Sequence, residues 1–315
     1  KAVRRDPWLY GRGSVDDGYG GYLCATSIRL LQEAGIPHPR CIMIIETCEE
    51  SGSFDLPPYL HELTDHLGNP DMIVVMDSGG PDYDHVWMTE ALRGLVSGTL
   101  SVKVSHEGIH SGNSGGSVPS SFRIQRILLD RVEDSTTGRI LIPEMHVDIS
   151  EEVRQKAESL EKIVGDSIWK QFPTVENLRQ VSESTEDMII SMNWEPTLSI
   201  IGADGIPSVQ DAGNVLRTNT DLKLSFRIPP GVDSQTAISA VKSILEENPP
   251  YGSEVSFTPD SAADGFRAPP LSETISDAIH DASNQLTGLP PLAIWTGGTI
   301  PFMAMMQAKY PEAMF

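Results

Sequence analysis

Acidic side chains occur at three turns of this chain, and their types and spacing could support metal chemistry. Two pairs lie in the segments GRGSVDDGYGG and ETCEESGS, and a single acid ends the run MIVVMD: Asp16, Asp17, Glu49, Glu50 and Asp77. Carboxylates that come together repel each other unless a cation lies between them, and zinc accepts Asp and Glu oxygens. A two-metal site needs a bridging carboxylate and a nearby unligated acid that takes a proton from water. The acids therefore indicate a candidate di-metal site.

Each acid also has a purely structural explanation. Asp16 and Asp17 could cap the helix expected after them, because Asp is favourable near a helix N-terminus. Glu49 and Glu50 could form a solvated turn in an acidic protein, and Asp77 could cap a turn. Composition and spacing alone leave both explanations open.

Two apolar runs are expected to position these acids. Residues 41–46 and 72–77 are continuous apolar runs, typical of strands covered on both faces. A helix is expected over about residues 19–34, ended by Gly35 and Pro37. Strands of this kind that alternate with helices predict an α/β domain with a parallel sheet. Because ligands bind at the carboxyl ends of the strands in such sheets, we expect the acids to gather at that edge.

The pattern changes near residue 91. Alternating apolar and polar residues predict half-exposed antiparallel strands over about residues 95–104, 197–201, 222–228 and 254–257. Helices are expected over about residues 119–132, 150–164 and 234–247. This order predicts an α+β sandwich, residues 92–261, inserted into a discontinuous first domain of residues 1–91 and 262–315. The last elements return the chain to that first domain, with a helix over about residues 271–285, a strand at 292–295 and a helix from about residue 300.

Composition excludes several classes of partner. The 315 residues include 44 acids and 23 bases, for a net charge of −21. Nucleic acids and anionic membranes both need a basic surface, so neither is expected to bind. No apolar run approaches the roughly 18 residues of a membrane helix. Cys24, Cys41 and Cys48 cannot all pair and lack metal-finger spacing, so we expect free thiols in a reducing compartment, the cytoplasm.

Four segments carry a family resemblance. GRGSVDDGYGG, ETCEESGS, the Asp that ends MIVVMD and HSGNSGGSVPS occur in the order and rough spacing of a known family. The chain resembles the di-zinc metallopeptidases of the carnosine dipeptidase, carboxypeptidase G and aminoacylase type (peptidase clan MH), above all their cytosolic non-specific dipeptidase branch. DAGNVLRTNT, LKLSFRIPP and TGGTIP agree, so the resemblance covers essentially the whole chain. It implies a zinc-peptidase-like α/β/α catalytic domain with an inserted α+β lid and dimerisation domain.

The resemblance also implies roles for the acids. Asp16 would bridge two zinc ions, Glu50 would ligate one of them and Asp77 the other. Glu49 would be the general base that deprotonates the bridging water. The implied cofactor is two Zn²⁺ per site, with Mn²⁺ or Co²⁺ as alternatives. Asp rather than Glu at position 77 favours a dipeptide with a free amino group as the substrate.

Further residues would bind substrate. His110 matches a family histidine that usually comes from the partner subunit and reaches the carbonyl group of the bound substrate. An imidazole there can stabilise an oxyanion. Arg227 would clamp the substrate carboxylate, Asn214 would orient the substrate, and Gly298 and Thr299 would contact its C-terminal end. The implied partners are a dipeptide or small peptide and a second copy of the chain, bound through the inserted domain. On the residues alone, His110 could also be a surface histidine, a less favoured alternative, and Arg227 could equally be an outward strand residue.

The sequence departs from the family pattern at both ends. No His-x-Asp motif precedes GRGSVDDGYGG, and no histidine follows TGGTIP, although the family takes one zinc ligand from each place. Thr296 also replaces a family glutamate, and the segment PDSAADGFRAP lacks the substrate histidine of some dipeptidases. We therefore expect a fragment truncated at both ends that binds zinc weakly and has little activity.

The predicted function of the parent protein is metal-dependent hydrolysis of dipeptides or short peptides. One alternative is an N-acyl-amino-acid deacylase or a carboxypeptidase of the same family. Another is an inactive fragment or scaffold, because the histidine ligands are absent. The clustered acids favour an enzyme over a scaffold, since a dead site has no need for them.

Overall fold

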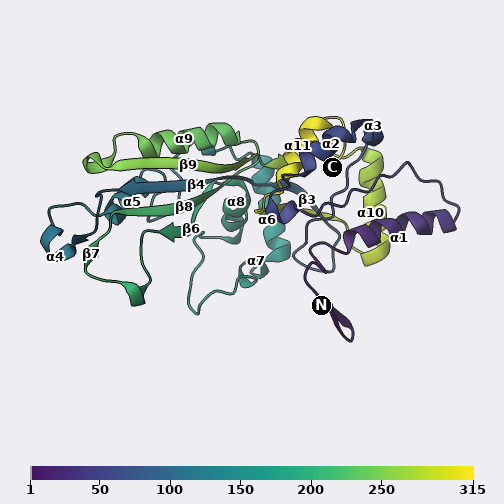
Figure 1. Cartoon of the computed structure of the whole chain (residues 1–315). Helices are drawn as coiled ribbons and strands as arrows, with labels where there is room; N and C mark the ends of the chain where they lie inside the picture. The colour runs from purple at the N-terminus through teal and green to yellow at the C-terminus, as the bar shows by residue number, and fades with distance from the viewer. Residues whose placement is uncertain (1) are drawn as a thin grey trace. The chain divides into compact units, whose positions relative to one another are not determined.

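The computed structural model describes residues 2–315, which form two compact units. The first unit consists of Lys1–Met88, Ala268–Leu292 and Met305–Phe315, and the second of Thr89–Arg267 and Ala293–Ala304. Both contain helices and β-structure (Figure 1). The assignment of a catalytic domain to residues 1–91 and 262–315, and of a lid to residues 92–261, stays a prediction.

Helices dominate the first unit. They are α1 (Gly20–Glu33), α2 (Leu56–Glu62), α3 (Thr64–Leu67) and α10 (Glu273–Thr287), and the part of α11 (Pro301–Lys309) from Met305 onward also belongs to this unit. The hydroxyl of Ser272 accepts the backbone N–H of Ile275 and so caps α10, which ends at Gly288 with φ 76°. Strands β1 (Val3–Arg5) and β2 (Trp8–Tyr10) pair as an antiparallel hairpin. The helix expected over residues 19–34 is confirmed by α1.

The two strands expected at residues 41–46 and 72–77 are wrong. Neither run is a strand, and Met72 makes only an isolated parallel bridge with Met314. Their side chains are not covered on both faces either, since Ile45 is 72% exposed and Val74 is 67% exposed. A strand needs a neighbour that pairs with its backbone, and no strand within residues 2–315 pairs with either run. Apolar character alone therefore misled the prediction.

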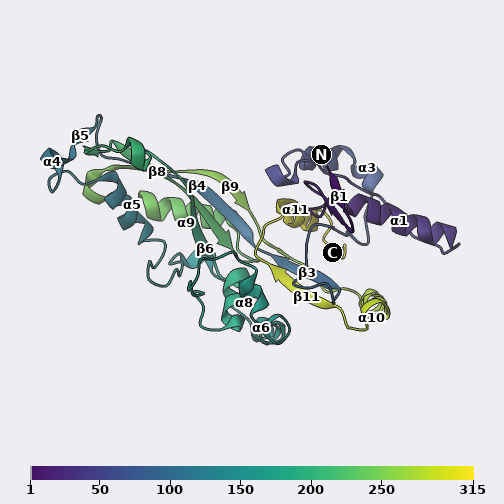
Figure 2. The same ribbon diagram turned by 90° about the horizontal axis from the view of Figure 1, so that it is seen from below.

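A four-stranded antiparallel sheet forms the core of the second unit. Its order is β6 (Thr197–Asp204), β8 (Asn219–Ile228), β4 (Gly94–Lys103) and β9 (Glu254–Ala263). Helices α5 (Ser121–Leu129) and α9 (Ser234–Glu246) pack on the sheet (Figures 1 and 2). Burial alternates along β8, so that every second side chain points into the core, as the period of two in a strand requires. The core includes Val96, Leu100, Ile124, Leu224 and Phe226, all fully buried.

One polar side chain ties α5 to this sheet. Gln125 is fully buried, and its amide nitrogen donates to the carbonyl oxygens of Leu100 on β4, at 2.9 Å, and Thr220 on β8, at 2.7 Å. Two strands and one helix are thereby joined by directional hydrogen bonds, and the buried hydroxyl groups of Ser121 on α5 and Thr220 on β8 form a further one at 2.8 Å.

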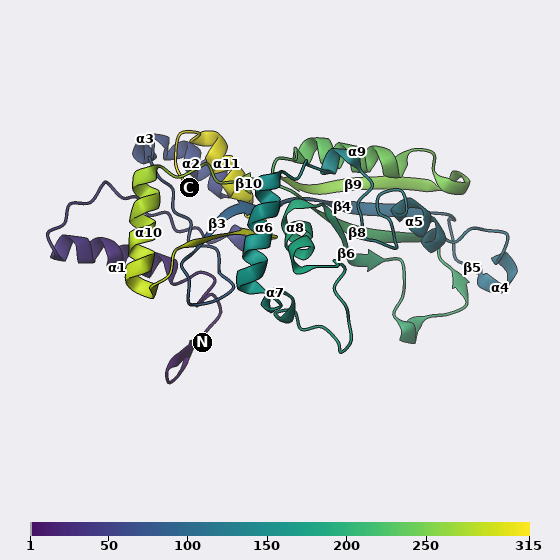
Figure 3. The same cartoon turned by 180° about the vertical axis from the view of Figure 1, so that it is seen from behind.

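Smaller elements complete the second unit. A three-stranded sheet has the order β10 (Phe266–Arg267), β3 (Trp87–Leu92) and β11 (Leu292–Thr296). Helix α6 (Glu151–Val164) packs against α8 (Thr185–Trp194), beside the short helix α7 (Ser167–Lys170), as Figure 3 shows. Strand β5 (Ile109–His110) pairs with β7 (Val215–Leu216) next to α4 (Ser111–Ser114).

Removal of a core ring should be costly. Phe226→Ala deletes a fully buried side chain from β8, and we expect the free energy of unfolding to fall by about 3–5 kcal/mol. Urea denaturation followed by fluorescence measures this loss. Phe122→Ala on α5, where the ring is 50% exposed, is the matched control and should cost far less. Equal losses in the two variants would contradict the packing described here.

Candidate metal and substrate sites

The predicted acids lie near one another in the first unit. Asp16 and Asp17 form the turn before α1, and Glu49 and Glu50 begin a 3₁₀ turn, Glu49–Ser51. Burial raises the pKa of Asp77, and the charges of Asp16 and Asp17 raise it further. Burial likewise raises the pKa of Glu49, with added repulsion from Asp77 and Glu50. The acids are therefore close enough to disfavour one another's charge.

The capping explanation for the first pair of acids does not hold. Helix α1 has Tyr19 at its N-cap, with no side-chain cap hydrogen bond. Asp17 instead accepts the backbone N–H of Gly20 through its own carbonyl, at 2.8 Å. Gly20 lies against neighbours that leave little room for a side chain, because an added carbon would lie 3.0 Å from Cβ of Met76. The start of α1 thus packs onto the segment that leads to Asp77.

The donor set suits a divalent cation in its chemistry. Its ligands are carboxylate oxygens, which hard and borderline metals accept, and a cation between them would relieve the repulsion that raises their pKa values. Within residues 2–315, however, no group of three or more His, Cys, Asp or Glu residues has an arrangement that could hold a metal ion. The assignment of Asp16, Glu50 and Asp77 as ligands therefore stays a prediction.

In the second unit, the structure brings His110 and Asn214 together. His110 ends β5 and pairs with Val215 of β7, and the backbone N–H of Ser111 donates to the carbonyl of Asn214 at 2.9 Å. The backbone N–H of Gly112 donates to Nδ1 of His110 at 3.2 Å. A neutral imidazole that accepts at Nδ1 carries its proton on Nε2, which leaves an outward N–H donor on an exposed side chain.

A second pair of predicted residues meets elsewhere in this unit. Nη1 of Arg227, on β8, donates to Oγ1 of Thr299 at 2.6 Å, next to the exposed Gly298. Burial lowers the pKa of Arg227. Sequence reasoning missed a neighbour, Arg93, whose pKa falls to about 10 through burial and then through the charge of Arg227. Nothing local marks Arg93 in the sequence, because its partners lie more than a hundred residues away.

The two pairs lie at opposite ends of one sheet. Strand β4 pairs its last residue, Lys103, with Asn219, and near its start it pairs Leu95 with Arg227. The eight residue-to-residue steps from Asn219 to Arg227 span roughly 26 Å of extended strand. Strand β7 ends at Leu216, shortly before β8 begins at Asn219, and β5 lies beyond that end of the sheet (Figure 2). Within one chain, the structure therefore does not bring His110 and Arg227 together.

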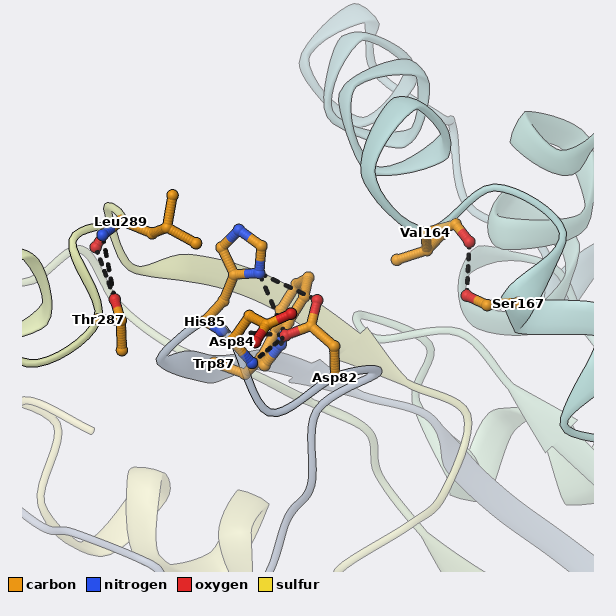
Figure 4. Close-up of polar contacts among 8 residues, drawn as sticks. All are labelled: Asp82, Asp84, His85, Trp87, Val164, Ser167, Thr287 and Leu289. Carbon is orange, nitrogen blue, oxygen red and sulfur yellow. Dashed lines mark hydrogen bonds and ion pairs between the residues drawn. The ribbon is translucent and has the colours of Figure 1, made fainter.

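A polar loop after Asp77 was also missed. Asp82 accepts hydrogen bonds from Nδ1 of His85, at 3.0 Å, from Nε1 of Trp87, at 3.1 Å, and from the backbone N–H groups of Asp84 and His85 (Figure 4). Burial opposes the charge of Asp82, but these four donors lower its pKa to about 2. The spacing Asp-x-x-His-x-Trp is its only local signal in the sequence.

This loop predicts a pH dependence of stability. The pKa of Asp82 is 3.8 when unperturbed and about 2 in the fold, so its stabilising effect is complete above pH 4 and is lost as the pH falls toward 2. Asp82→Asn should lower the melting temperature at pH 7, and the difference from the parent should shrink as the pH falls from 4 through 2. Thermal melts at several pH values measure it. Asp84→Asn, which alters an exposed side chain, is the control, and a difference that is as large at pH 2 as at pH 7 would contradict the assignment.

No helix within residues 2–315 is long and apolar enough to cross a membrane. The cysteines Cys24, Cys41 and Cys48 are all free thiols. Both observations concern the part of the chain that the structure describes.

Proteins similar to this chain are named as dipeptidases. A cysteinylglycine-S-conjugate dipeptidase of Corynebacterium striatum is 24% identical over 99% of this chain and 66% of its own length. A beta-Ala-His dipeptidase of Mus musculus is 26% identical over 96% of this chain and 62% of its own length. The chain thus spans 62–66% of the length of these relatives.

The fold has a counterpart among solved structures. The crystal structure of human carnosine dipeptidase 1 superposes with a TM-score of 0.75 at 24% identity, covering 98% of this chain and 65% of that one. This likeness confirms the predicted fold class. A sequence model of peptidase family M20/M25/M40 matches residues 1–315, which confirms the resemblance that the motifs indicated. The chain therefore belongs to peptidase family M20/M25/M40.

Proposed function

We propose that the protein hydrolyses the peptide bond of dipeptides or short peptides, with Glu49 as the general base. The observation that carries this proposal is the cluster of Asp16, Glu49, Glu50 and Asp77, in which burial and then repulsion from neighbouring acids raise the pKa values of Glu49 and Asp77. Clustered carboxylates, two of them half-buried, are unfavourable without a cation, and family membership supports a metallopeptidase. The dipeptidase names of the relatives support the choice of substrate.

The acids divide into ligands and base. Asp16, Glu50 and Asp77 would hold two divalent ions, which we propose to be Zn²⁺, with Mn²⁺ or Co²⁺ as alternatives. When bound, such ions polarise a carbonyl and lower the pKa of water. Glu49 would accept a proton from the attacking water and return it to the leaving amine, and a raised pKa favours that second step because the group must then act as an acid.

The second unit would bind the substrate. Arg227 offers a planar guanidinium to the substrate carboxylate, and Gly298 and Thr299 line the same position. The Nε2–H group of His110 would donate a hydrogen bond to the oxyanion that forms when water attacks the carbonyl. Asn214 beside it would orient the substrate. Asp at position 77 leads us to propose a substrate with a free amino group.

We also propose a homodimer, formed through the second unit. Strand β6 is an edge of the four-stranded sheet, and its Ile200 and Ile201 are 50% and 62% exposed. An apolar edge strand without a neighbour is a template for pairing with another chain. The separation of His110 from Arg227 within one chain further supports a histidine that acts on the partner's substrate. The free cysteines support a cytoplasmic location.

Replacement of the general base should separate catalysis from metal binding. In the whole protein, Glu49→Gln should slow dipeptide hydrolysis by about 10²–10⁴-fold and leave the zinc stoichiometry unchanged, because an amide cannot accept the proton. Glu46→Gln is the matched control, since Glu46 also raises the pKa of Glu49 but has no proposed role in proton transfer. Turnover of Glu49→Gln at the parental rate would reject the assignment. N-acetylated amino acids, tested beside free dipeptides, detect a deacylase instead.

The dimer has a separate test. Ile201→Lys places a charge on the exposed edge of β6, so the mass measured by light scattering should fall to that of a monomer. Val209→Lys is the control, because Val209 is 94% exposed and lies outside β6. A dimer that survives Ile201→Lys, or a parent chain that is already monomeric, would rule out this edge as the interface.

A further inference from the structure

Arg93 joins the turn between β3 and β4 to a distant loop, residues 296–299. Its Nε donates to the carbonyl of Gly297 at 3.1 Å, and its Nη1 donates to Oγ1 of Thr197 at 3.2 Å. Its backbone N–H donates to the carbonyl of Thr296 at 3.3 Å. Arg93 therefore holds this loop through both its main chain and its side chain.

The loop is built to let Arg93 approach. A side-chain carbon at position 297 would lie 3.0 Å from Nη2 of Arg93 and 3.0 Å from the carbonyl oxygen of Met192, so a larger residue would press on both. The residue before the loop, Trp295, is buried against Trp194 in an edge-to-face contact with ring centroids 5.3 Å apart. At the other end, Thr299 is bound by Arg227. The loop is thus fixed at its start, middle and end.

The charges around the loop are unbalanced. Arg93 and Arg227 are near enough for one guanidinium to destabilise the other, and both are partly buried. Among the ion pairs within residues 2–315, none joins either arginine to a carboxylate. Their contacts described above are all with neutral oxygens. Desolvated cations of this kind are normally paired with an anion, so the pair favours a negatively charged ligand.

We propose that Arg93 is a positioning residue of a carboxylate-binding site at residues 296–299, where it shapes the loop and adds a second positive charge beside Arg227. The inference rests on the proposed function, because it takes the ligand to be the terminal carboxylate of a peptide. It adds a residue that the motifs did not indicate. Gly298 is exposed, which leaves the loop open to such a ligand.

The test measures binding rather than hydrolysis. The probe is N-acetyl-alanine, and its amide, N-acetyl-alaninamide, lacks the charge but keeps the shape. Titration of the ¹⁵N-labelled 315-residue chain, without added metal, should shift the Nε–H resonances of Arg93 and Arg227 with the acid and not with the amide. Arg93→Gln should weaken acid binding by about tenfold or more, because charge-assisted hydrogen bonds are lost. Arg93→Lys keeps the charge without the fork and should recover part of the affinity.

Arg131 supplies the matched control. It also donates to backbone carbonyls, those of Ile244, Glu247 and Asn248 at the end of α9, and has no proposed ligand. Arg131→Gln should lower the melting temperature and leave acid binding unchanged. If Arg93→Gln and Arg93→Lys likewise lower the melting temperature but leave acid binding unchanged, the role of Arg93 is structural and the proposal is overturned. It is also overturned if acid and amide bind alike, or if neither binds at concentrations up to tens of millimolar.

This outcome is independent of the outcome for peptide hydrolysis. Carboxylate binding that depends on Arg93, in a whole protein that cleaves no dipeptide, would reject the proposed reaction and keep the site. Dipeptide hydrolysis by the whole protein, together with unaltered acid binding in Arg93→Gln, would support the proposed reaction and reject the role of Arg93.

Discussion

The pairing of β4 with both of its neighbours is the constraint on which the second unit depends. Strand β4 is bonded to β8 along its entire length and to β9 along nearly all of it, so its register fixes the core and the positions of the polar residues together. The same register puts Leu95 opposite Arg227, two residues from Arg93, and puts Lys103 opposite Asn219 near the β5–β7 pair. A slip of one residue would turn each side chain of β4 to the other face. The backbone ladder thus positions residues that never touch one another.

Like charges crowd in both units, with opposite sign. In the first unit, Glu49 and Asp77 lie beside other acids, and their raised pKa values record that cost. In the second unit, Arg93 and Arg227 are partly buried side by side. Folded proteins tolerate such crowding where a counter-charge arrives with the ligand. The cation proposed for the acids and the carboxylate proposed for the arginines would each supply the missing counter-charge.

Local signals predicted most of the second unit. Strand β8 alternates apolar and polar residues, α6 begins after Ser150 and ends at Gly165, and each was found from the sequence within a few residues. Helix α8 was missed because its buried residues lie on several faces of the helix and form no single apolar stripe. In the first unit, residues 41–46 and 72–77 have the composition of buried strands but no neighbour in the described chain that pairs with them. Composition cannot supply a partner strand.

The candidate site divides in the same way. The acids, His110, Asn214 and Arg227 were proposed as site residues from the order of the motifs, and their roles stay predictions. Arg93 was not, since its role depends on contacts with Thr197 and Gly297, which the fold alone brings near. The hydrogen bonds of Asp82 are local, but a carboxylate with a histidine three residues later does not by itself predict them. They depend on a backbone conformation that directs two N–H groups at the carboxylate.

The buried amide of Gln125 has a consequence for how uniquely this fold is specified. Apolar contacts between a helix and a sheet have little direction, and a helix could slide by part of a turn at small cost. The two hydrogen bonds from Gln125 reach carbonyls on adjacent strands, and they can be made together in only one alignment. Its amide oxygen has no hydrogen-bond partner, so this selectivity has an energetic cost. Hydrogen-bond geometry, rather than the strength of apolar contacts, therefore fixes the position of helix α5 on the sheet.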